Sequence, residues 1–343
     1  MIKILLIKRG AIGDLLMATP LIRQLKQKVN CELDIVVGKT AAIAIKNNPY
    51  INNTIILDDE LFSISGMTKL HNALKPFKKK YDYVFVLDKH WYFNFVAKSL
   101  GGITVGYVRE RLSNIALKYS VKYHDVTRYH GFYYLDLLHA SGIAKADYDD
   151  IALDLHVSLQ DKQDADDFAK LQLLDNYVVF VNSGGNNAYE KNGIRMLPHD
   201  KAIVLIHRLL ADEKIVVLAG GKLDFEHYEE YCRELHYHPR LINAAGRLGL
   251  AASGVIFAKA KHVYTTDCGA MHIAVAMKIG DKLTSFFGPT NPRHILPPAY
   301  LSTAIWLDDA IYDSAYQLNG AKRRNEPNYF TNLDVNLVNL VNG

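Results

Sequence analysis

The residues from Val263 to Pro292 combine several groups that can bind an anion. An apolar and β-branched run, Val263–Thr266, predicts the end of a buried strand. Asp267-Cys268-Gly269 ends that strand and supplies an N-cap type of residue for a helix over Ala270–Lys278. The first N–H groups of a helix have no partner within it, and the helix dipole adds positive character there. The turn is therefore a candidate site for a phosphate or diphosphate, and His272 would lie beside it.

A second apolar strand, Leu283–Phe287, follows this helix and stops at the rigid sequence Gly288-Pro289-Thr290-Asn291-Pro292. Open α/β sheets bind their ligands at the carboxyl ends of such strands. The alternative is an ordinary strand–helix–strand unit in which Asp267 does no more than cap a helix. Residue types and spacing alone leave both interpretations open.

A carboxylate lies just after the first strand-like run of the chain. Ile4–Ile7 leads into Gly10-Ala11-Ile12-Gly13-Asp14, and a helix over Leu15–Lys28 follows, interrupted only by Pro20. The turn reads Gly-x-x-Gly-Asp rather than the dinucleotide pattern Gly-x-Gly-x-x-Gly, which removes the main support for hydride transfer. Its two glycines, Gly10 and Gly13, have no side chain, so a bound molecule can approach the backbone closely there. From spacing alone, Asp14 is either a helix N-cap or a catalytic group at the mouth of a sheet.

Small and amide residues follow the strand expected over Tyr177–Val181. The loop Asn182-Ser183-Gly184-Gly185-Asn186-Asn187 can wrap a phosphate with its backbone and short side chains. Two cations, Lys191 and Arg195, come next, before a helix expected over Asp200–Leu210. The segment is a candidate anion site, and a basic surface loop is the alternative.

An acidic residue also follows the strand expected over Ile215–Ala219. Asp224 ends the turn Gly220-Gly221-Lys222-Leu223-Asp224. A carboxylate in this place can accept hydrogen bonds from ribose hydroxyls, as in other nucleotide-binding sheets. It can equally cap the helix expected over Glu226–Leu235, so both roles stay open.

The histidines and cysteines do not form a pattern typical of a metal site. His236 and His238 lie between a helix and a strand without a matching third ligand nearby. The three cysteines, Cys31, Cys232 and Cys268, are widely spaced and odd in number, which argues against a disulfide framework or a zinc site. We therefore expect no metal, and a reducing cytoplasmic environment.

Strands and helices alternate along the chain, as in an α/β protein with parallel, doubly wound sheets. In the first half, strands are expected over Leu33–Val37, Ile55–Leu57 and Tyr83–Leu87, with a helix over Trp91–Leu100. A length of 343 residues exceeds one compact α/β unit of common size and favours two domains. The polar, helical stretch Leu155–Asp175 is the expected junction between them.

Composition excludes several classes of protein. With 49% hydrophobic and 22% charged residues, the chain is typical of a globular protein with a sizeable core. The net charge of +4 is too small by itself to argue for nucleic acid. No apolar run approaches the roughly 20 residues of a membrane span. The run Met1–Ile7 is too short, and too soon followed by charge, for a signal peptide.

The motifs described above resemble those of a known family. Asp267-x-Gly269-x-x-His272, an alanine-rich helix and Phe287-Gly288-Pro289-Thr290-x-Pro292 resemble the nucleotide-sugar signature of glycosyltransferase family 9. Lys8-x-Gly10-x-x-Gly13-Asp14-x-x-x-x-x-Pro20 resembles the N-terminal motif of the same family. That family contains the ADP-heptose:lipopolysaccharide heptosyltransferases. The resemblance spans most of the chain and is loosest between Lys39 and Asp150.

The resemblance implies a GT-B architecture, in which two Rossmann-like domains with parallel sheets face each other across a central cleft. Residues 1–160 would form the N-terminal acceptor-binding domain, and residues 175–330 the nucleotide-sugar domain. A helix in 331–343 would pack back on the first domain. The implied chemistry is an inverting, metal-independent transfer without a cofactor, in which Asp14 is the general base that takes the proton of the acceptor hydroxyl.

The resemblance also implies which residues hold the donor, ADP-L-glycero-D-manno-heptose. Arg195 occupies the register of a family lysine and would neutralise the leaving diphosphate, together with Lys8 and the helix start after Asp267. The full expected set is Lys8, Gly13, Ser183, Gly184, Arg195, Asp224, Asp267, Cys268, Gly269, Ala270 and His272. Two departures stand out: Leu197 replaces a family tryptophan, and the turn before Asp224 lacks the family's proline and glutamate.

The implied acceptor is the Kdo and heptose region of lipopolysaccharide or lipooligosaccharide, a lipid-linked anionic glycan. Arginine suits its carboxylates, and Arg109 and Arg128 are the expected contacts. The expected location is the cytoplasm, with room for peripheral contact at the inner face of the inner membrane. Two alternatives stay open: a family relative that moves another sugar or uses another glycan, and a non-catalytic nucleotide-sugar-binding protein. The retained Asp14 argues against the second.

Overall fold

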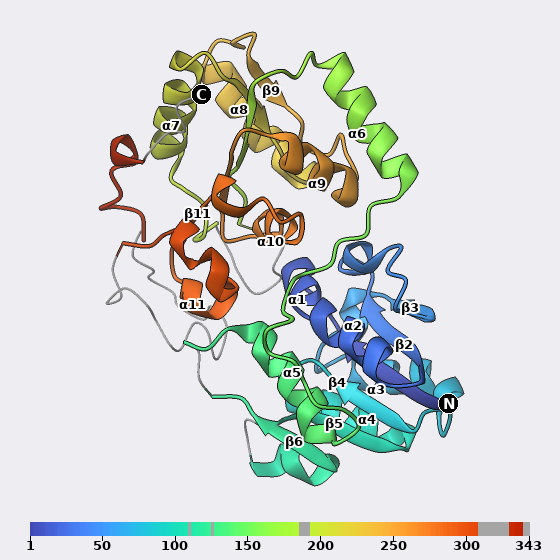
Figure 1. The fold of residues 1–343 in the computed structure, drawn as a ribbon. Helices are drawn as coiled ribbons and strands as arrows, with labels where there is room; N and C mark the ends of the chain where they lie inside the picture. The colour runs from blue at the N-terminus through green and yellow to red at the C-terminus, as the bar shows by residue number, and fades with distance from the viewer. Residues whose placement is uncertain (109–110, 125–126, 185–192, 308–328, 339–343) are drawn as a thin grey trace. The chain divides into compact units, whose positions relative to one another are not determined.

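The computed structural model describes residues 1–108, 111–124, 127–184, 193–307 and 329–338. The chain divides into two compact units, Met1–His156 and Val157–Gly343. Each unit is built on a six-stranded sheet (Figure 1).

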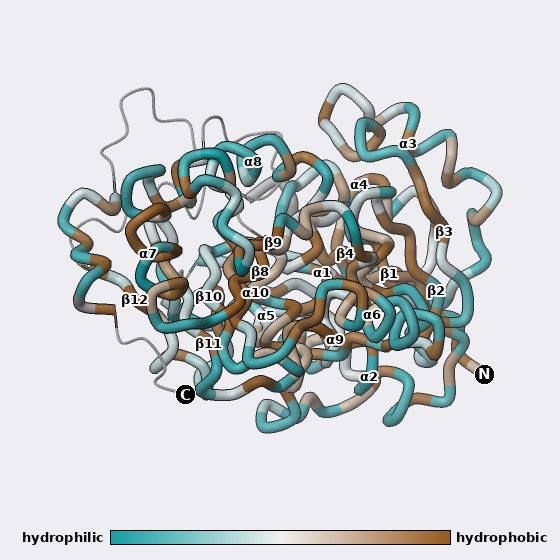
Figure 2. The backbone as a smooth tube through the Cα atoms, turned by 90° about the horizontal axis from the view of Figure 1, so that it is seen from above, coloured by the Kyte–Doolittle hydropathy of each residue, from teal (hydrophilic) through white to brown (hydrophobic). Residues whose placement is uncertain are grey.

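The sheet of the first unit has the strand order β3-β2-β1-β4-β5-β6, and every neighbouring pair is parallel. Its strands are β1 (Ile2–Lys8), β2 (Cys31–Gly38), β3 (Asn53–Leu57), β4 (Tyr83–Val86), β5 (Ile103–Val108) and β6 (Tyr119–Lys122). The residues Ile4–Ile7 of the central strand β1 are completely buried. A continuous apolar run is typical of a parallel strand that is covered on both faces. Val84–Val86 of β4 are buried in the same way, and both strands are coloured as hydrophobic in Figure 2.

The helices of the first unit connect and cover these strands. They are α1 (Ile12–Met17), α2 (Thr19–Lys28), α3 (Met67–Leu74), α4 (Trp91–Leu100) and α5 (His130–Ser141), with short 3-10 segments η1 (Ala42–Ile45), η2 (Asp59–Phe62), η3 (Lys75–Phe77) and η4 (Arg111–Ala116). The single helix expected over 15–28 is two helices that meet at Ala18. Pro20 lies in the first turn of α2, where its missing N–H breaks no helical hydrogen bond.

The second unit repeats this topology, with the strand order β12-β11-β10-β7-β8-β9. Its strands are β7 (Tyr177–Val181), β8 (Ile215–Leu218), β9 (Leu241–Asn243), β10 (Val263–Thr266), β11 (Leu283–Phe286) and β12 (Ala304–Ile305), all paired in parallel. Counted within each unit, both sheets have the order 3-2-1-4-5-6 of the Rossmann fold. The predicted fold class, α/β with two Rossmann-like parallel sheets, is confirmed.

The helices of the second unit are α6 (Leu159–Leu171), α7 (His199–Ala211), α8 (Phe225–Glu234), α9 (Leu250–Lys259), α10 (Gly269–Ala276) and α11 (Pro292–Ile295), with 3-10 segments η5 (Lys222–Asp224), η6 (Gly280–Lys282), η7 (Pro298–Thr303) and η9 (Val335–Leu337). No helix in the described part of the chain is long and apolar enough to span a membrane.

The helix α6 belongs to the second unit, although we expected 155–175 to join the domains. It begins with a reciprocal capping box between Ser158 and Asp161 and packs against α9. Its few apolar residues include the buried Ala165 and Phe168, and the guanidinium of Arg247 lies 4.9 Å from the Phe168 ring centroid. The polarity of α6 therefore marks an exposed helix with a narrow buried stripe rather than a linker.

The end of the described chain also differs from the expectation of a helix that returns to the first domain. Residues 329–338 contain one 3-10 turn, η9, and pack on α7 of the second unit. Lys201 donates a hydrogen bond to the carbonyl of Leu333 at 2.6 Å, and Arg208 donates to the carbonyls of Val335 and Val338. These contacts attach the segment to the apolar cluster under α7; residues 339–343 lie outside the described residues.

Candidate active site

The candidate residues of the first unit lie where the strand order reverses. The chain leaves β1 and β4, which are neighbours, toward opposite sides of the sheet, and ligands bind at such switch points. Lys8 is the last residue of β1, Asp88 follows β4, and Asp14 lies in the first turn of α1. The fold thus brings one cation and two carboxylates to one edge of the sheet.

Lys8 is buried between the two carboxylates. Its side chain is 3% exposed, and its ammonium lies 3.1 Å from Asp88 Oδ1 and 3.3 Å from Asp14 Oδ2. Burial acts to lower the pKa of Lys8, but the charges and hydrogen bonds of Asp88 and Asp14 outweigh it and raise that pKa. Lys8 is therefore a permanent cation that holds the Asp14 carboxylate.

Asp14 is not the N-cap of its helix, so the N-cap alternative is wrong. The N-cap of α1 is Ala11, and Asp14 is the third helical residue. Its side chain remains 40% exposed while one of its oxygens binds Lys8. The neighbouring Gly13 is buried. Asp14 thus has a fixed position and an accessible carboxylate, as a general base requires.

Asp88 is a residue whose role the sequence did not reveal. It is 8% exposed, and its second oxygen accepts a hydrogen bond of 2.6 Å from the backbone N–H of Arg9. Asp88 therefore connects the end of β4 to the end of β1. The available signal was an acidic residue directly after a buried strand, but its partner is 80 positions away in the sequence.

Of the two arginines expected to contact the acceptor, the structure describes only Arg128. Arg109 lies outside the described residues. Arg128 binds both oxygens of Asp136, and its guanidinium lies 4.9 Å from the Tyr133 ring centroid. The hydrogen bond that Arg128 donates to Asp136 is the main cause that raises the pKa of Arg128. Arg128 therefore anchors the start of α5, and no described contact points to an acceptor role.

In the second unit, the predicted residues again gather at the switch point, between β7 and β10. The hydroxyl of Thr266, the last residue of β10, donates to the carbonyl of Ser183 at 2.7 Å and accepts from its N–H at 3.2 Å. Gly184 packs so closely on Gly193 that a Cβ added to it would lie 3.2 Å from the Gly193 Cα. These contacts fix Ser183 against β10 and Gly184 against Gly193.

Asp267 is buried and binds side chains of two neighbouring segments. It does not cap α10, so the prediction that it is a helix N-cap is wrong. The N-cap of α10 is Cys268. Asp267 is 2% exposed; its carboxylate lies 3.4 Å from Arg195 and accepts a hydrogen bond from the hydroxyl of Thr290. Asp267 therefore ties the Arg195 segment to the loop after β11.

The start of α10 is formed by small residues, as expected, with Gly269 and Ala270 in its first turn. The buried Cys268 thiol lies against the amides of Ala270 and Met271; burial raises its pKa, and hydrogen bonds from Thr265 and these amides oppose the shift. His272 is 5% exposed on the same helix. The helix presents its N-terminal amides at the switch point, where an anion would be stabilised.

Asp224 is connected to the same group of residues. It occupies the N-cap position of α8 without a capping side-chain bond, and its carboxylate accepts a hydrogen bond of 2.7 Å from the N–H of Gly221. Burial raises the pKa of Asp224, and hydrogen bonds from Gly221 and the Ser183 side chain oppose that rise. The structure thus joins Asp224 to Ser183 and, through Thr266, to the end of β10.

Asn182 is a second residue that sequence reasoning did not single out for a role. It is completely buried, and its side-chain amide binds both the N–H and the carbonyl of Leu197, at 2.8 and 3.0 Å. It also donates to the hydroxyl of Tyr231 at 2.8 Å. Asn182 therefore holds the segment that carries Arg195; Lys191, between them, lies outside the described residues.

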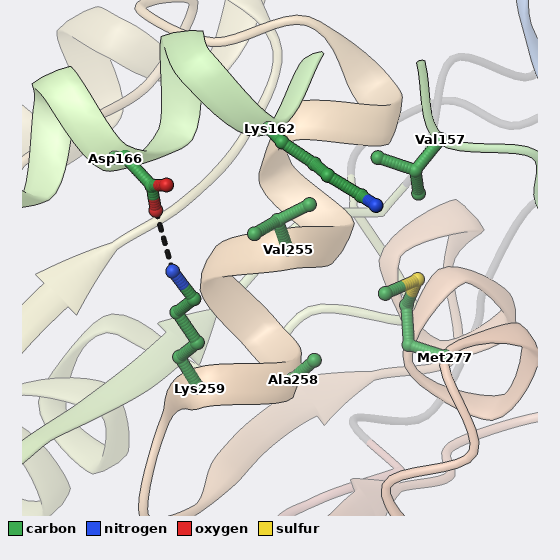
Figure 3. A pocket seen from close by; sticks show the side chains of 7 residues that line it. All are labelled: Val157, Lys162, Asp166, Val255, Ala258, Lys259 and Met277. Carbon is green, nitrogen blue, oxygen red and sulfur yellow. Dashed lines mark hydrogen bonds and ion pairs between the residues drawn. The ribbon is translucent and has the colours of Figure 1, made fainter. Parts of the chain in front are cut away.

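A separate hollow in the second unit lies between α6 and α9 and contains none of the predicted site residues (Figure 3). Its lining is Val157, Lys162, Asp166, Val255, Ala258, Lys259 and Met277, with Lys259 paired to Asp166. Within the described ranges, no group of three or more His, Cys, Asp or Glu side chains is placed to hold a metal ion.

Comparison with known proteins identifies relatives of this chain in sequence and in fold. Residues 67–317 match the family model described as glycosyltransferase family 9 (heptosyltransferase). The lipooligosaccharide heptosyltransferase 2 of Haemophilus influenzae is 25% identical over 316 residues, which cover 89% of this chain and 88% of that protein.

Solved structures show the same fold. A family 9 glycosyltransferase from Veillonella parvula matches with a TM-score of 0.72 at 19% identity, covering 92% of this chain and 88% of that one. The E. coli ADP-heptose lipopolysaccharide heptosyltransferase II matches with a TM-score of 0.69 at 23% identity, covering 90% of this chain and 92% of that one. The chain belongs to glycosyltransferase family 9, the heptosyltransferase family, and is a glycosyltransferase of the GT-B fold class.

Proposed function

We propose that this enzyme transfers heptose from ADP-L-glycero-D-manno-heptose to the Kdo and heptose region of lipopolysaccharide or lipooligosaccharide. Its family and the name of its Haemophilus relative support this substrate class. The observation that carries the catalytic part is the pairing of a buried Lys8 with an accessible Asp14 at the switch point of the first sheet.

In the proposed reaction, Asp14 takes the proton of the acceptor hydroxyl while the hydroxyl oxygen attacks the anomeric carbon of the donor. The new carbon–oxygen bond forms on the face opposite the bond to the diphosphate, so the configuration inverts. The electrons of the breaking bond remain on the diphosphate. Lys8 holds Asp14 in position through its 3.3 Å contact, and Asp88 holds Lys8 in turn.

The second unit would bind the donor. Arg195 and the N-terminal amides of α10 are suited to the diphosphate, because its negative charge increases as the glycosidic bond breaks. Ser183 and Gly184 would border the phosphates, and Asp224 would accept hydrogen bonds from ribose hydroxyls.

We propose that transfer needs no metal ion, because Arg195 and the helix N-terminus supply positive charge where the diphosphate departs. Turnover in the presence of excess EDTA should equal turnover without it. A loss of activity that Mg²⁺ or Mn²⁺ restores would contradict this part of the proposal.

The donor is tested by following thermal stability with ADP, UDP and GDP and with their sugar conjugates. A ligand at 100 times its dissociation constant adds about 2.7 kcal/mol to the free energy of unfolding, which is readily measured. ADP and ADP-heptose should stabilise the protein, and the uridine and guanosine compounds should have little effect.

The departures from the family pattern around Leu197 and Asp224 favour one second candidate, transfer of another sugar or to another glycan. A preference for UDP or GDP would support that candidate and exclude the heptose donor. No stabilisation by any nucleotide would contradict both.

A further inference from the structure

The helix α4 carries an exposed pair of large aromatic side chains. Trp91 and Phe95 are each 37% exposed and one helical turn apart. Their ring centroids lie 5.7 Å apart in an edge-to-face arrangement. The opposite side of α4 is buried in the first unit, where Phe93 and Leu100 join the apolar core. The aromatic pair is therefore not needed to attach the helix.

A third apolar side chain extends this surface. Ile115 of η4 is 64% exposed, and its carbonyl accepts a hydrogen bond of 2.9 Å from Lys98. Lys98 continues the line of Trp91 and Phe95 along α4, because positions 91, 95 and 98 share one helix face. We name Trp91, Phe95 and Ile115 the α4 patch.

Lysines border the α4 patch. Lys98 is exposed on the helix face of Trp91 and Phe95, and Lys118, three positions after Ile115, is also exposed. Lys79, whose N–H donates to the carbonyl of Leu100 at 2.6 Å, lies at the C-terminal end of α4 between the exposed Lys78 and Lys80. Residues 61–124 contain nine lysines and two arginines against three acidic residues, although the whole chain has a net charge of only +4. One of those acidic residues, Asp88, is buried on Lys8.

Aromatic and aliphatic side chains within a cationic border are the composition of a surface that enters the interface of an anionic bilayer. We propose that the α4 patch docks on an anionic lipid membrane, with Trp91 and Phe95 at the level of the headgroups. This inference rests on the proposed function in one respect, since it supplies a reason for docking: the acceptor is attached to lipid.

The position of the patch fits that role. The helix α4 follows β4 in the first unit (Figure 1). Trp91 begins α4 three residues after Asp88, which binds Lys8 at the edge of the sheet that also carries Asp14. A membrane that contacts the first turn of α4 is therefore near the edge that holds the proposed base. Docking would raise the local concentration of a lipid-linked acceptor at Asp14.

A second copy of the chain is a less suitable partner for this surface. In a symmetric dimer the same patch would face itself, and the lysines around it would face lysines. Like charges brought together across an interface oppose association. An anionic membrane neutralises the same lysines.

The direct test uses Trp91 as its own probe. The chain has two tryptophans, so a Trp306→Phe protein retains Trp91 alone. Vesicles of phosphatidylethanolamine and phosphatidylglycerol should shift its fluorescence to the blue, and brominated lipids should quench it. Vesicles of phosphatidylcholine should have a much smaller effect. An unchanged spectrum with the anionic vesicles would overturn the proposal.

A set of variants tests the patch itself by vesicle sedimentation. Trp91→Ser with Phe95→Ser should lower the affinity for anionic vesicles by about tenfold or more, and Lys98→Gln should lower it and weaken its dependence on salt. The matched control is Phe225→Ser, because Phe225 is 40% exposed on a helix of the second unit. Thermal melting of each variant shows that the fold is kept. Equal binding by all of these proteins would overturn the proposal.

Two further measurements separate this inference from its alternatives. Analytical ultracentrifugation that finds a dimer dissociated by the Trp91 and Phe95 changes would assign the patch to a second copy and overturn membrane docking. In transfer assays, the same changes should raise KM for acceptor in vesicles and leave KM for a lipid-free acceptor unchanged. Failure of transfer to both acceptors by the unaltered protein, with vesicle binding intact, would reject the proposed function and not the docking surface.

Discussion

Lys8 determines the charge balance of the first unit's candidate site. Its buried ammonium is shared by Asp14, which is accessible, and Asp88, which is nearly buried. Two carboxylates this close would repel each other without the cation between them. The arrangement fixes Asp14 from one side while its side chain remains 40% exposed.

Replacement of Asp14 by asparagine should remove catalysis and keep donor binding. Asparagine has the same shape but cannot take the proton, so kcat should fall about a hundredfold to ten-thousandfold. Stabilisation by ADP should remain, because all of the expected donor residues except Lys8 and Gly13 are in the second unit. Steady-state kinetics and thermal shift measure the two effects. The exposed Asp58→Asn is a matched control that should keep full activity. Retained turnover in Asp14→Asn would rule out the general base.

The Lys8–Asp88 pair should show strong coupling in a double-mutant cycle. Lys8→Met leaves a nearly buried carboxylate unpaired and should cost about 3 kcal/mol of the free energy of unfolding. Asp88→Asn keeps an acceptor for the Arg9 N–H. The double variant should lose about 1 to 2 kcal/mol less than the sum of the single changes. Additive losses in denaturant titrations would show that the two side chains do not interact.

At the scale of elements, the loops of the second unit are held by buried polar side chains at strand ends. Asn182 after β7 binds the Leu197 backbone twice, and Thr266 at the end of β10 binds the Ser183 backbone twice. These bonds satisfy backbone groups that secondary structure leaves unpaired. The loops that would contact a nucleotide are therefore positioned by the sheet.

Asn182→Ala should weaken donor binding without any change in a donor contact. The backbone groups of Leu197 would lose their partner, so stability should fall by about 2 kcal/mol, and the Arg195 segment would lose its anchor. The affinity for ADP, measured by calorimetry, should fall with it. Asn243→Ala is the control: Asn243, the last residue of β9, donates a hydrogen bond to Glu229 of α8, and its loss should leave ADP affinity unchanged. Equal ADP affinity in both variants would contradict the anchoring role.

At the scale of the whole molecule, the two units use one topology twice. Each has the strand order 3-2-1-4-5-6, and each gathers its candidate residues at the carboxyl ends of the two central strands. The first unit carries the carboxylate proposed as the base, and the second carries the turn suited to an anion. This division is what a transferase needs to treat acceptor and donor separately.

The stability of the second unit should depend on pH through His262. It is 4% exposed, donates or accepts a hydrogen bond with Thr284 at 2.8 Å, and burial lowers its pKa to about 4, although Asp281 acts in the opposite direction. The unfolded chain takes up this proton near pH 6.5 and the folded one near 4. Stability should therefore be complete above about pH 6.5 and decrease as the pH falls toward 4, by at most about 3 kcal/mol.

His262→Gln, which keeps a partner for Thr284, should reduce this acid sensitivity. Denaturant titrations of the two proteins between pH 7 and pH 4 measure the difference. The exposed His207→Gln on α7 is the matched control and should keep the wild-type pH dependence. Parallel pH profiles of His262→Gln and the unaltered protein would show that His262 is not the group responsible.

Much of the fold could be predicted from local patterns. The helix over Trp91–Leu100 and the strands over Tyr177–Val181 and Val263–Thr266 have the predicted bounds. Apolar runs, their periodicity and glycine-containing turns indicate these elements from residues that are close together in the chain. The bounds of α6 and the place of residues 329–338 could not be predicted, because they depend on tertiary packing. The helix α6 packs on α9, and residues 329–338 pack on α7.

The sequence by itself determined the element types, the two parallel sheets and the turns at Asp14 and Asp267 that could do chemistry, because each follows from residues close together in the chain. Only the tertiary structure decided which polar groups meet. Lys8 reaches Asp88 because the strand order makes β1 and β4 neighbours, and Asp267 is held by Arg195 and Thr290 instead of capping α10. A carboxylate takes the partners that the fold brings nearest, and the spacing along the chain does not specify them.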